Sequence, residues 1–198
     1  MPPSPISISR VSGKKILPWL DQLAALRVRI FRDFPYLYEG DLAYEQNYLK
    51  TYTHSPRSLV VLALDNDRVV GASTGVPMLD AEPAFRQPFI EHGHDPAEIF
   101  YFGESVLDGA YRGRGIGHRF FDEREAFARE HGFRMTTFCA VERPEDHPAR
   151  PTHYRALDEF WRGRGYQRVG GMITHFHWRD IGADSETDKP MQFWVRQL

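Results

Sequence analysis

The chain has 198 residues, of which 41% are hydrophobic and 26% charged, and its formal net charge at pH 7 is −2. This length and apolar content suffice for one well-buried core and are short for two, so we expect a single domain over residues 1–198. Arg and Lys are scattered among carboxylates rather than gathered into a basic block, which excludes the usual charge pattern of a protein that binds DNA or RNA.

The cysteine content and the hydrophobic pattern indicate the cellular compartment of the protein. The single cysteine, Cys139, excludes an internal disulfide bond. No apolar stretch approaches the roughly 18 residues of a membrane-spanning helix, and the N-terminus lacks a charged-then-apolar signal pattern. We therefore expect a cytoplasmic protein without a membrane partner.

The first half of the chain predicts strands and helices in alternation after a flexible Pro-rich tail, residues 1–5. Period-two alternation predicts a strand at 6–11, and helical spacing of apolar residues predicts helices at 17–31 and 42–50. Two apolar runs, 59–64 and 69–76, predict a hairpin around Asp65-Asn66-Asp67. Residues 77–95 contain Pro77, Pro83, Pro88 and Gly93, so we interpret them as an insertion or a lid over a site.

The second half opens on an apolar strand, 99–107, and a helix from Gly117 to His131 that Gly132 should end. Further along, the pattern predicts a strand at 134–141, a helix at 152–162, and late strands at 166–169, 172–178 and 192–195. The resulting order, β-α-α-β-β-β-α-β-α-β-β, predicts a mixed α/β fold with helices on both faces of the sheet.

The most informative motif lies between that strand and that helix, at Arg112-Gly113-Arg114-Gly115-Ile116-Gly117. Its glycines let successive N–H groups converge where the positive end of a helix begins, and its arginines suit phosphate oxygens. Taken alone, such a run is as often a flexible basic loop as a ligand cradle. A P-loop is excluded because no Lys occurs between Lys50 and Lys189. A dinucleotide fingerprint is disfavoured because His118 stands where its third Gly should be.

The remaining pattern, Arg-x-x-Gly-x-Gly after a strand, resembles the acyl-coenzyme A loop of the GCN5-related N-acetyltransferase (GNAT) family, and the order of elements extends the resemblance over about residues 6–180. The resemblance implies a mostly antiparallel mixed sheet, acetyl-CoA as donor, direct attack by an amine in a ternary complex, and a homodimer as one assembly. It assigns the donor site to main-chain groups of the strand and to the loop: Ser105, Val106, Leu107, Arg112, Gly113, Arg114, Gly115, Ile116, Gly117 and His118.

Acyl transfer to an amine needs a neutral nucleophile, a donor for the oxyanion and a proton for the thiolate. A Lys-like amine is neutral in only about one part in 2,500 at pH 7, a penalty of roughly 4.6 kcal/mol, so a base matters most. Glu98 and Glu104 lie six residues apart and are expected on one face of the strand. Some family members use a glutamate of this strand as the base, and we prefer Glu104. The alternative is a carboxylate held by an Arg or facing solvent.

The general acid is where the sequence departs from the family. The position of the usual Tyr, on the helix after the fifth strand, holds Trp161, which cannot protonate sulfur. Tyr154, two turns upstream on the predicted helix, is the candidate acid, with packing as its alternative role. The departure prompts a second hypothesis, a GNAT-fold module that binds acyl-CoA without turnover.

Other side chains support weaker hypotheses. The aromatic and acidic segment 34–48, which includes Glu39, Asp41 and Glu45, would suit a small-molecule or peptide amine acceptor, and equally a helix packed on its core. His175 and His177 share a strand face, but two ligands without a third do not predict a metal site. We interpret Cys139 as a buried small hydrophobe, the alternative being a thiol that intercepts an acyl group.

Overall fold

The computed structural model describes residues 5–198, so the predicted tail lies outside the described residues except for Pro5. Its longer elements follow the predicted order with one additional helix. They are β1 (Ser7–Val11), α1 (Leu20–Ile30), α2 (Leu42–His54), β2 (Leu59–Asp65), β3 (Arg68–Pro77), α3 (Pro83–Glu91), β4 (Ile99–Tyr101), β5 (Ser105–Leu107), α4 (Ile116–Glu130), β6 (Met135–Val141), α5 (Asp158–Gly163), β7 (Gln167–Arg179) and β8 (Glu186–Gln197).

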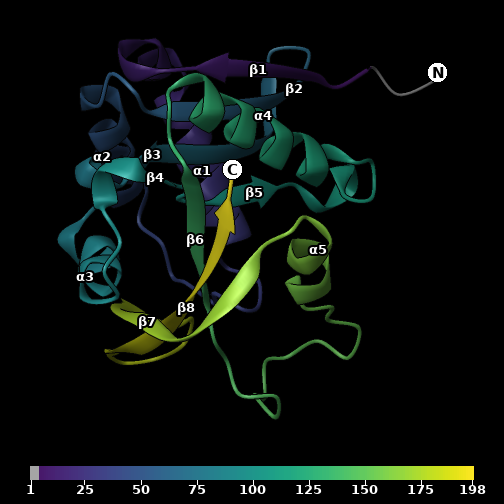
Figure 1. Ribbon diagram of the computed structural model, residues 1–198. Coiled ribbons are helices and arrows are strands. Elements are labelled where there is room, and N and C mark those ends of the chain that lie inside the picture. Colours follow the sequence, from purple (N-terminus) through teal and green to yellow (C-terminus); the bar gives the residue numbers. More distant parts are fainter. Residues whose placement is uncertain (1–4) are drawn as a thin grey trace.

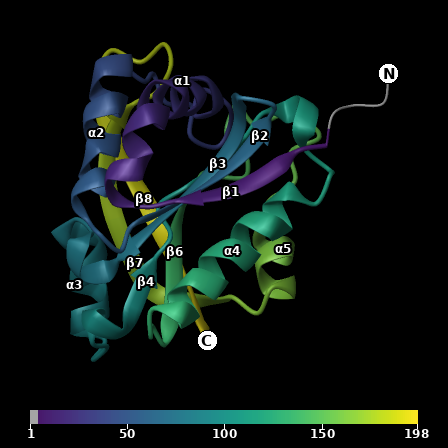
Figure 2. The ribbon, with the colours of Figure 1, turned by 90° about the horizontal axis from the view of Figure 1, so that it is seen from above.

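The strands form one mixed sheet in the order β1-β2-β3-β4-β6-β8-β7, with β5 also paired to β3. Neighbouring strands run antiparallel except β4 and β6, which are parallel. Figures 1 and 2 show α1 and α2 on one face of the sheet and α4 and α5 on the other. The predicted fold class, a mostly antiparallel mixed sheet flanked by helices on both faces, is confirmed.

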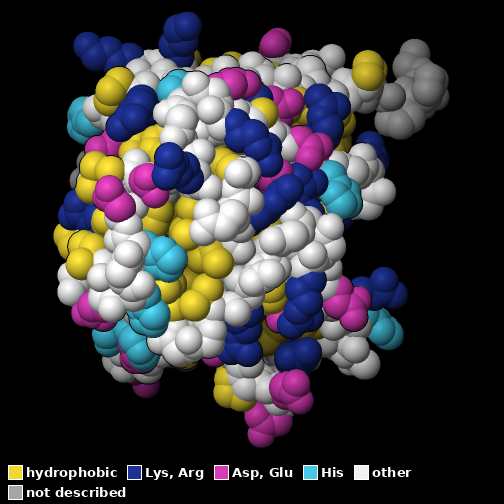
Figure 3. All heavy atoms as spheres, viewed as in Figure 1, with side chains coloured by type: hydrophobic (Ala, Val, Ile, Leu, Met, Phe, Trp, Pro, Cys, Tyr) yellow, Lys and Arg dark blue, Asp and Glu magenta, His cyan; other side chains and the backbone are white. Residues whose placement is uncertain are grey.

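Each face of the sheet carries its own hydrophobic core. On the α1 face, Leu23 and Leu26 pack with β-strand residues such as Val60. On the α4 face, Phe120 and Phe127 pack with Val61 and its neighbours. The continuous apolar run of β2 reflects this burial on both sides, because neighbouring side chains of a strand point to opposite faces. On the surface, Figure 3 shows Arg and Lys interspersed with Asp and Glu, as the sequence predicted.

The segment 77–95, expected to be an insertion or a lid, contributes buried side chains to the core of the α1 face. Met78 and Phe89 are both fully buried in the core of the α1 face. Phe85 stacks on Tyr101 and Phe176, with ring centroids 4.4 and 4.7 Å apart. Pro83 begins α3 and Pro88 lies inside it, whereas Pro77 ends β3, which explains the broken pattern in the sequence.

The late elements differ in their bounds from the predictions. Helix α5 begins at Asp158, six residues after the predicted start, because residues 152–157 form turns beyond Pro151. The strands predicted at 166–169 and 172–178 are one strand, β7, with a register shift between Arg168 and Ile173. The strand predicted at 192–195 is the end of the longer β8.

The strand predicted at 99–107 is divided by a β-bulge. Val76 of β3 pairs with Tyr101, and Ser73 of β3 pairs with Ser105. Two residues of β3 therefore oppose three residues, 102–104, so the divided strand carries one extra residue. A Cβ at Gly103 would lie 2.2 Å from Oη of Tyr52, which is why a glycine fits at this point.

Candidate active site

The sheet opens between β5 and β6, directly after the bulge. Strand β4 pairs with β6 from Ile99 to Tyr101, and Phe102 N donates to Thr137 O at 2.8 Å. Beyond that bond, β6 continues alongside β8, whereas among the strands of residues 5–198 β5 pairs with β3 alone. The edge of β5 that faces β6 is therefore free to bind another chain or a ligand.

Main-chain groups of β5 point into this opening. Thr74 N donates to Glu104 O at 3.0 Å, and Asp108 N donates to Val70 O at 2.9 Å. Because hydrogen-bonded and non-hydrogen-bonded residues alternate in an antiparallel pair, the main-chain groups of Ser105 and Leu107 face away from β3. Those of Val106 bond to β3.

The glycine-rich loop places the uncapped start of α4 at the end of β5. Gly113 and Gly115 have φ of 74° and 77°, and a Cβ at either would meet no atom within 4 Å. Gly115 is the N-cap, which supplies no capping side chain, and the first turn of α4 holds no acidic residue. The N–H groups of Ile116, Gly117 and His118 thus lack helical partners and can bind an anion.

Arginines flank the loop. Arg112 Nε donates to Leu107 O at 3.3 Å, and its Nη2 lies 3.7 Å from Asp33 Oδ2. Arg114 Nη2 donates to Ala110 O at 3.0 Å, and its guanidinium lies 5.0 Å from the centroid of the Tyr111 ring. Both arginines remain exposed, so their remaining donors are available to phosphate oxygens.

Other residues hold this loop in place. The side chain of Ile116 is buried in the core of the α4 face. Gly117 lies close to Phe160 of α5, to which His118 packs edge-on with ring centroids 4.8 Å apart. Tyr111 donates to Asp65 Oδ2 at 2.5 Å, which supports its structural role.

The Glu104 side chain lies on the α1 face of the opening. Its Oε1 is 2.5 Å from Arg27 Nη1, and the two side chains are 7% and 10% exposed. Arg27 Nε in turn donates to Glu45 Oε2 at 2.5 Å. Of the acidic segment, Glu45 therefore connects to Glu104 through Arg27, whereas Glu39 pairs with Arg179 and Asp41 caps α2.

Glu98 is placed apart from Glu104, contrary to the expectation that they share a strand face. It belongs to a 3-10 turn before β4, where its side chain is 49% exposed and lies 3.2 Å from Arg134 Nη1. The expectation was wrong because Glu98 precedes the strand and the bulge interrupts the alternation of side chains.

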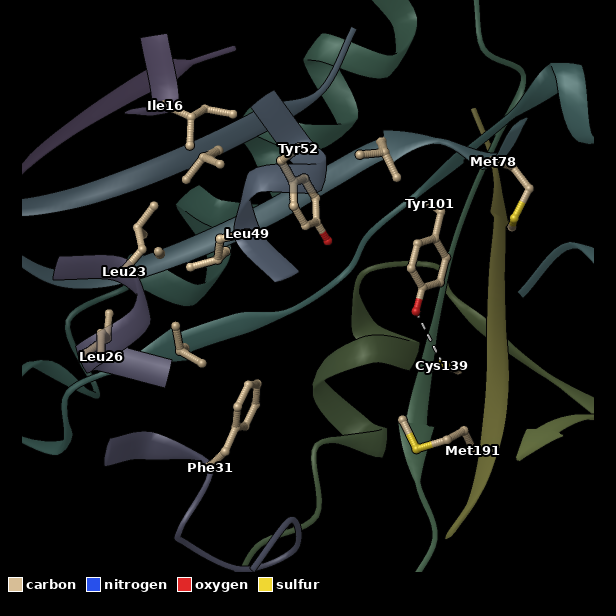
Figure 4. Close-up of a cluster of buried hydrophobic side chains, with 14 of the residues drawn as sticks. Ile16, Leu23, Leu26, Phe31, Leu49, Tyr52, Met78, Tyr101, Cys139 and Met191 are labelled. Atoms are coloured by element: carbon tan, nitrogen blue, oxygen red, sulfur yellow. Dashed lines mark hydrogen bonds between the residues drawn. The ribbon is translucent and has the colours of Figure 1, made fainter. Parts of the chain in front are cut away.

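A chain of hydroxyl groups runs from the bulge into the core of the α1 face. Glu104 N donates to Thr74 Oγ1 at 3.1 Å, Thr74 Oγ1 donates to Tyr52 Oη at 3.1 Å, and Tyr48 Oη lies 3.2 Å further on. Burial raises the pKa of Tyr52, and the Glu104 carboxylate raises it further. Figure 4 shows Tyr52 beside Tyr101, which bonds to Cys139 at 3.4 Å. These phenols are neutral hydrogen-bonding groups at physiological pH.

Tyr154 is not on a helix, contrary to the expectation, but in the turn before α5. It packs edge-on against Phe34, with ring centroids 4.7 Å apart, and burial raises its pKa. Trp161 packs on Phe138 and Trp194, with ring centroids 5.0 and 5.1 Å apart. Cys139 is buried, as expected, and burial raises the pKa of its thiol to about 12.

The loop between α1 and α2 adds Tyr36, which was not among the predicted site residues. Arg143 Nη2 and Trp178 Nε1 donate to its carbonyl oxygen at 2.7 and 3.0 Å. Burial raises the pKa of its phenol, and the negative charge of Glu104 adds to this effect. The same Arg143 bonds both oxygens of Asp180 at 2.8 Å, which fixes the loop to the end of β7.

No three His, Cys, Asp or Glu side chains within residues 5–198 form a group able to hold a metal ion. His175 and His177 instead approach Asp188, at 2.7 and 3.7 Å. None of the helices in the described range is both long enough and apolar enough to cross a bilayer.

Comparison with known proteins identifies the fold. Over 97% of this chain and 99% of the other, the structure is similar to ribosomal-protein-alanine N-acetyltransferase from Brucella melitensis, with a TM-score of 0.62 and 16% identity. A putative acetyltransferase from Acinetobacter baylyi aligns over 98% and 94%, with a TM-score of 0.64 and 12% identity.

An aminoglycoside 6'-N-acetyltransferase solved with coenzyme A aligns over 96% of both chains, with a TM-score of 0.61 and 17% identity. No curated protein matches the sequence. The sequence model of the acetyltransferase (GNAT) family matches residues 22–158, more than half of the chain. This protein therefore belongs to the GNAT acetyltransferase family.

Proposed function

We propose that this protein transfers the acetyl group of acetyl-CoA to a primary amine by direct attack in a ternary complex. The proposal rests on the opening between β5 and β6, which joins the two parts of the candidate site. The free edge of β5 runs from the uncapped start of α4, an anion site, to the buried carboxylate of Glu104. One acyl-CoA molecule laid along that edge would have its pyrophosphate at α4 and its thioester at the bulge.

The donor would be held mainly by main-chain groups. N–H groups of Gly113 to His118, with Arg112 and Arg114, would bind the pyrophosphate, because they combine free donors with positive charge. The main chain of Ser105 and Leu107 would bond to the pantetheine arm as a neighbouring strand does, whereas that of Val106 already bonds to β3. The open space around Gly113 and Gly115 fits a phosphate that approaches the backbone closely.

Glu104 is the group best placed to accept the proton of the amine. The amine nitrogen forms a bond to the acyl carbon, the carbon–sulfur bond breaks, and the nitrogen's proton passes to the carboxylate directly or through water. The thiolate, with a reference pKa of about 8.5, leaves without an obligatory acid and is then protonated, by Tyr154 or by water. Glu98, exposed and paired with Arg134, is the weaker candidate.

A second function is favoured by two specific observations. Trp161 occupies the position of the family's usual acid, and Arg27 already holds the Glu104 carboxylate. A protein with these features could bind acyl-CoA without turning it over. The two functions make the same prediction for CoA binding and opposite predictions for acyl transfer.

Free thiol release separates the two functions. Acetyl-CoA would be incubated with the protein and a panel of polyamines, amino acids, aminoglycosides and peptide N-termini, each compared with a reaction lacking acceptor. Release above background with at least one amine, together with the mass of the acetylated product, supports the transferase. Tight CoA binding without product across the panel supports the binding module. Absence of CoA binding contradicts both.

A further inference from the structure

Arg124 is a charged residue on the apolar face of α4. It follows Phe120 by four residues and precedes Phe127 by three, so it belongs to the stripe that packs on the sheet. Its exposed fraction is 2%, although arginine is rarely buried to this degree without a partner of opposite charge. Its side chain reaches under the bulge, on the face opposite to Arg27.

All the groups that accept hydrogen bonds from the Arg124 guanidinium are neutral. Nε donates to Phe120 O at 3.2 Å, Nη2 donates to Ser105 Oγ at 2.9 Å, and Nη1 donates to Thr74 O and Glu104 O, both at 3.3 Å. Burial lowers the pKa of Arg124 to about 10. Arg124 is therefore still a cation at neutral pH. Removing its guanidinium from water is unfavourable, and the hydrogen bonds to these acceptors offset part of that cost.

One of those acceptors belongs to the peptide group at the head of the opening. The Glu104 carbonyl oxygen accepts from Thr74 N at 3.0 Å and from Arg124 Nη1 at 3.3 Å. In a planar trans peptide the N–H points opposite to the C=O, so the N–H of Ser105 points away from β3 and into the opening. A cation on the oxygen withdraws electron density from the nitrogen, and hydrogen bonds at the two ends of a peptide strengthen each other.

We propose that Arg124 is a positioning residue, which fixes and polarises the Glu104–Ser105 peptide group so that the Ser105 N–H stabilises the oxyanion of the acyl-transfer reaction. This inference rests on the proposed function, because the oxyanion forms only when the acyl group lies at the bulge. A purely structural role, in which Arg124 only joins α4 to the sheet, predicts a change in stability alone.

The test compares Arg124→Met, which removes the charge and keeps most of the volume, with Arg124→Lys, which keeps the charge. Arg10→Met is the matched control, because it removes a different arginine of the α4 face, whose ion pairs are with Glu123 and Glu130 of α4. Thermal unfolding and circular dichroism establish that each variant is folded. The ¹³C shift of the Glu104 carbonyl, measured without ligand, reports polarisation directly.

A second measurement uses a ketone analogue of acetyl-CoA, in which a methylene separates a ¹³C-labelled carbonyl from sulfur. Bound to the wild type, the label should shift downfield as Ser105 N–H bonds to its oxygen. Arg124→Met should lose a large part of that shift and lower kcat roughly 10-fold, a fraction of the effect of deleting an oxyanion donor. KM for acetyl-CoA should change less than about twofold, and Arg124→Lys and Arg10→Met should stay near the wild type.

The outcomes distinguish this inference from the proposed function. If the analogue fails to bind the wild type, the proposed function is wrong. If it binds and gives equal carbonyl shifts in the wild type and a folded Arg124→Met variant, the role of Arg124 is wrong and the function stands.

If Arg124→Met does not fold, Arg124→Lys can still test the role of the charge at this position. A buried lysine loses its proton below its usual pKa of about 10.4, so its charge can be removed by raising the pH. The Glu104 carbonyl shift and kcat should then titrate together. If the carbonyl shift and kcat change independently with pH, the inference is wrong. The charged or titratable groups that act on this position are Tyr166, Glu104, Glu125 and Tyr52, whose own variants would identify their contributions.

Discussion

The carboxylate of Glu104 and the guanidinium of Arg27 meet at 2.5 Å on the α1 face of the sheet, next to the opening between β5 and β6. Arg27 also binds Glu45, so two carboxylates share one cation and the buried triad carries a net negative charge. Glu45 therefore offers a matched comparison for Glu104, because both carboxylates contact the same arginine and only Glu104 lies at the bulge.

Replacing either carboxylate of the triad separates catalysis from stability. Glu104→Gln should lower kcat about 100-fold, because the base is lost. Glu45→Gln is the matched control, since it disturbs the same arginine and should lower the unfolding temperature without a comparable loss of kcat. Activity at saturating acetyl-CoA and thermal unfolding of both variants are the measurements. Equal losses of kcat would show that the triad is structural.

A glutamate at Gly115 should abolish CoA binding. The residue has φ of 77°, so any L-residue there costs about 1–2 kcal/mol, and a carboxylate at the start of α4 repels phosphate. Gly93→Glu is the control, because Gly93 has the same φ and the same open surroundings but follows α3. Calorimetric titration with CoA should show loss of binding for Gly115→Glu only; unchanged affinity would exclude the loop as the site.

The bulge should be intolerant of a methyl group. A Cβ at Gly103 would lie 2.2 Å from Tyr52 Oη and 2.5 Å from Thr74 Oγ1, so Gly103→Ala should destabilise the protein by about 1–3 kcal/mol. Adding Tyr52→Phe removes the nearer oxygen, and the double variant should be more stable than the sum of the single changes predicts. Urea unfolding measures the free energy of unfolding of the single and double variants. If the two single changes in free energy simply add, the bulge has moved away from Tyr52.

The Asp180 ion pair should give a specific dependence of stability on acid. Burial alone would raise the pKa of Asp180, but the hydrogen bonds and charge of Arg143 hold it below its usual value. The stabilisation is therefore complete above the unfolded pKa of about 3.9 and is lost as pH falls through the lower folded value. Urea midpoints from pH 7 to 3 should fall more steeply for the wild type than for Asp180→Asn; parallel curves would contradict this.

Cys139 should be unreactive in the native protein. Burial raises its thiol pKa to about 12, so the thiolate is scarce at pH 8 and shielded from reagents. A chromogenic disulfide reagent should label the thiol slowly in buffer and rapidly in urea. Rapid labelling of the folded protein would instead support the alternative that this thiol intercepts an acyl group.

The fold and the glycine-rich turn before α4 could be predicted from the sequence because their signals are local, whereas the role of that turn in binding CoA stays a prediction. The glycine and arginine spacing at 112–117 and the apolar stripe of α4 are contained in a few turns of chain. The start of α5 could not be found, since residues 152–157 keep helical composition while packing Tyr154 on Phe34. The roles of Glu104, Tyr154 and Glu98 stay predictions.

The buried arginines left a readable signal that the prediction did not use. Arg27 lies in phase with Leu20 and Leu23 on α1, and Arg124 lies in phase with Phe120 and Phe127 on α4. A cation on an apolar stripe indicates a buried polar partner on the sheet beneath it. Which partner it is depends on strand register, which no local pattern contains.

The extra residue of the bulge sets the direction of every side chain after it. Phe100 and Phe102 face α4, as their even spacing requires, yet Glu104 and Val106 face α1. In a strand of the same length that alternated without the bulge, Glu104 would share the face of Phe102 under α4 and would point away from Arg27. The extra residue therefore decides that the carboxylate lies on the α1 face, beside Arg27, and not under α4.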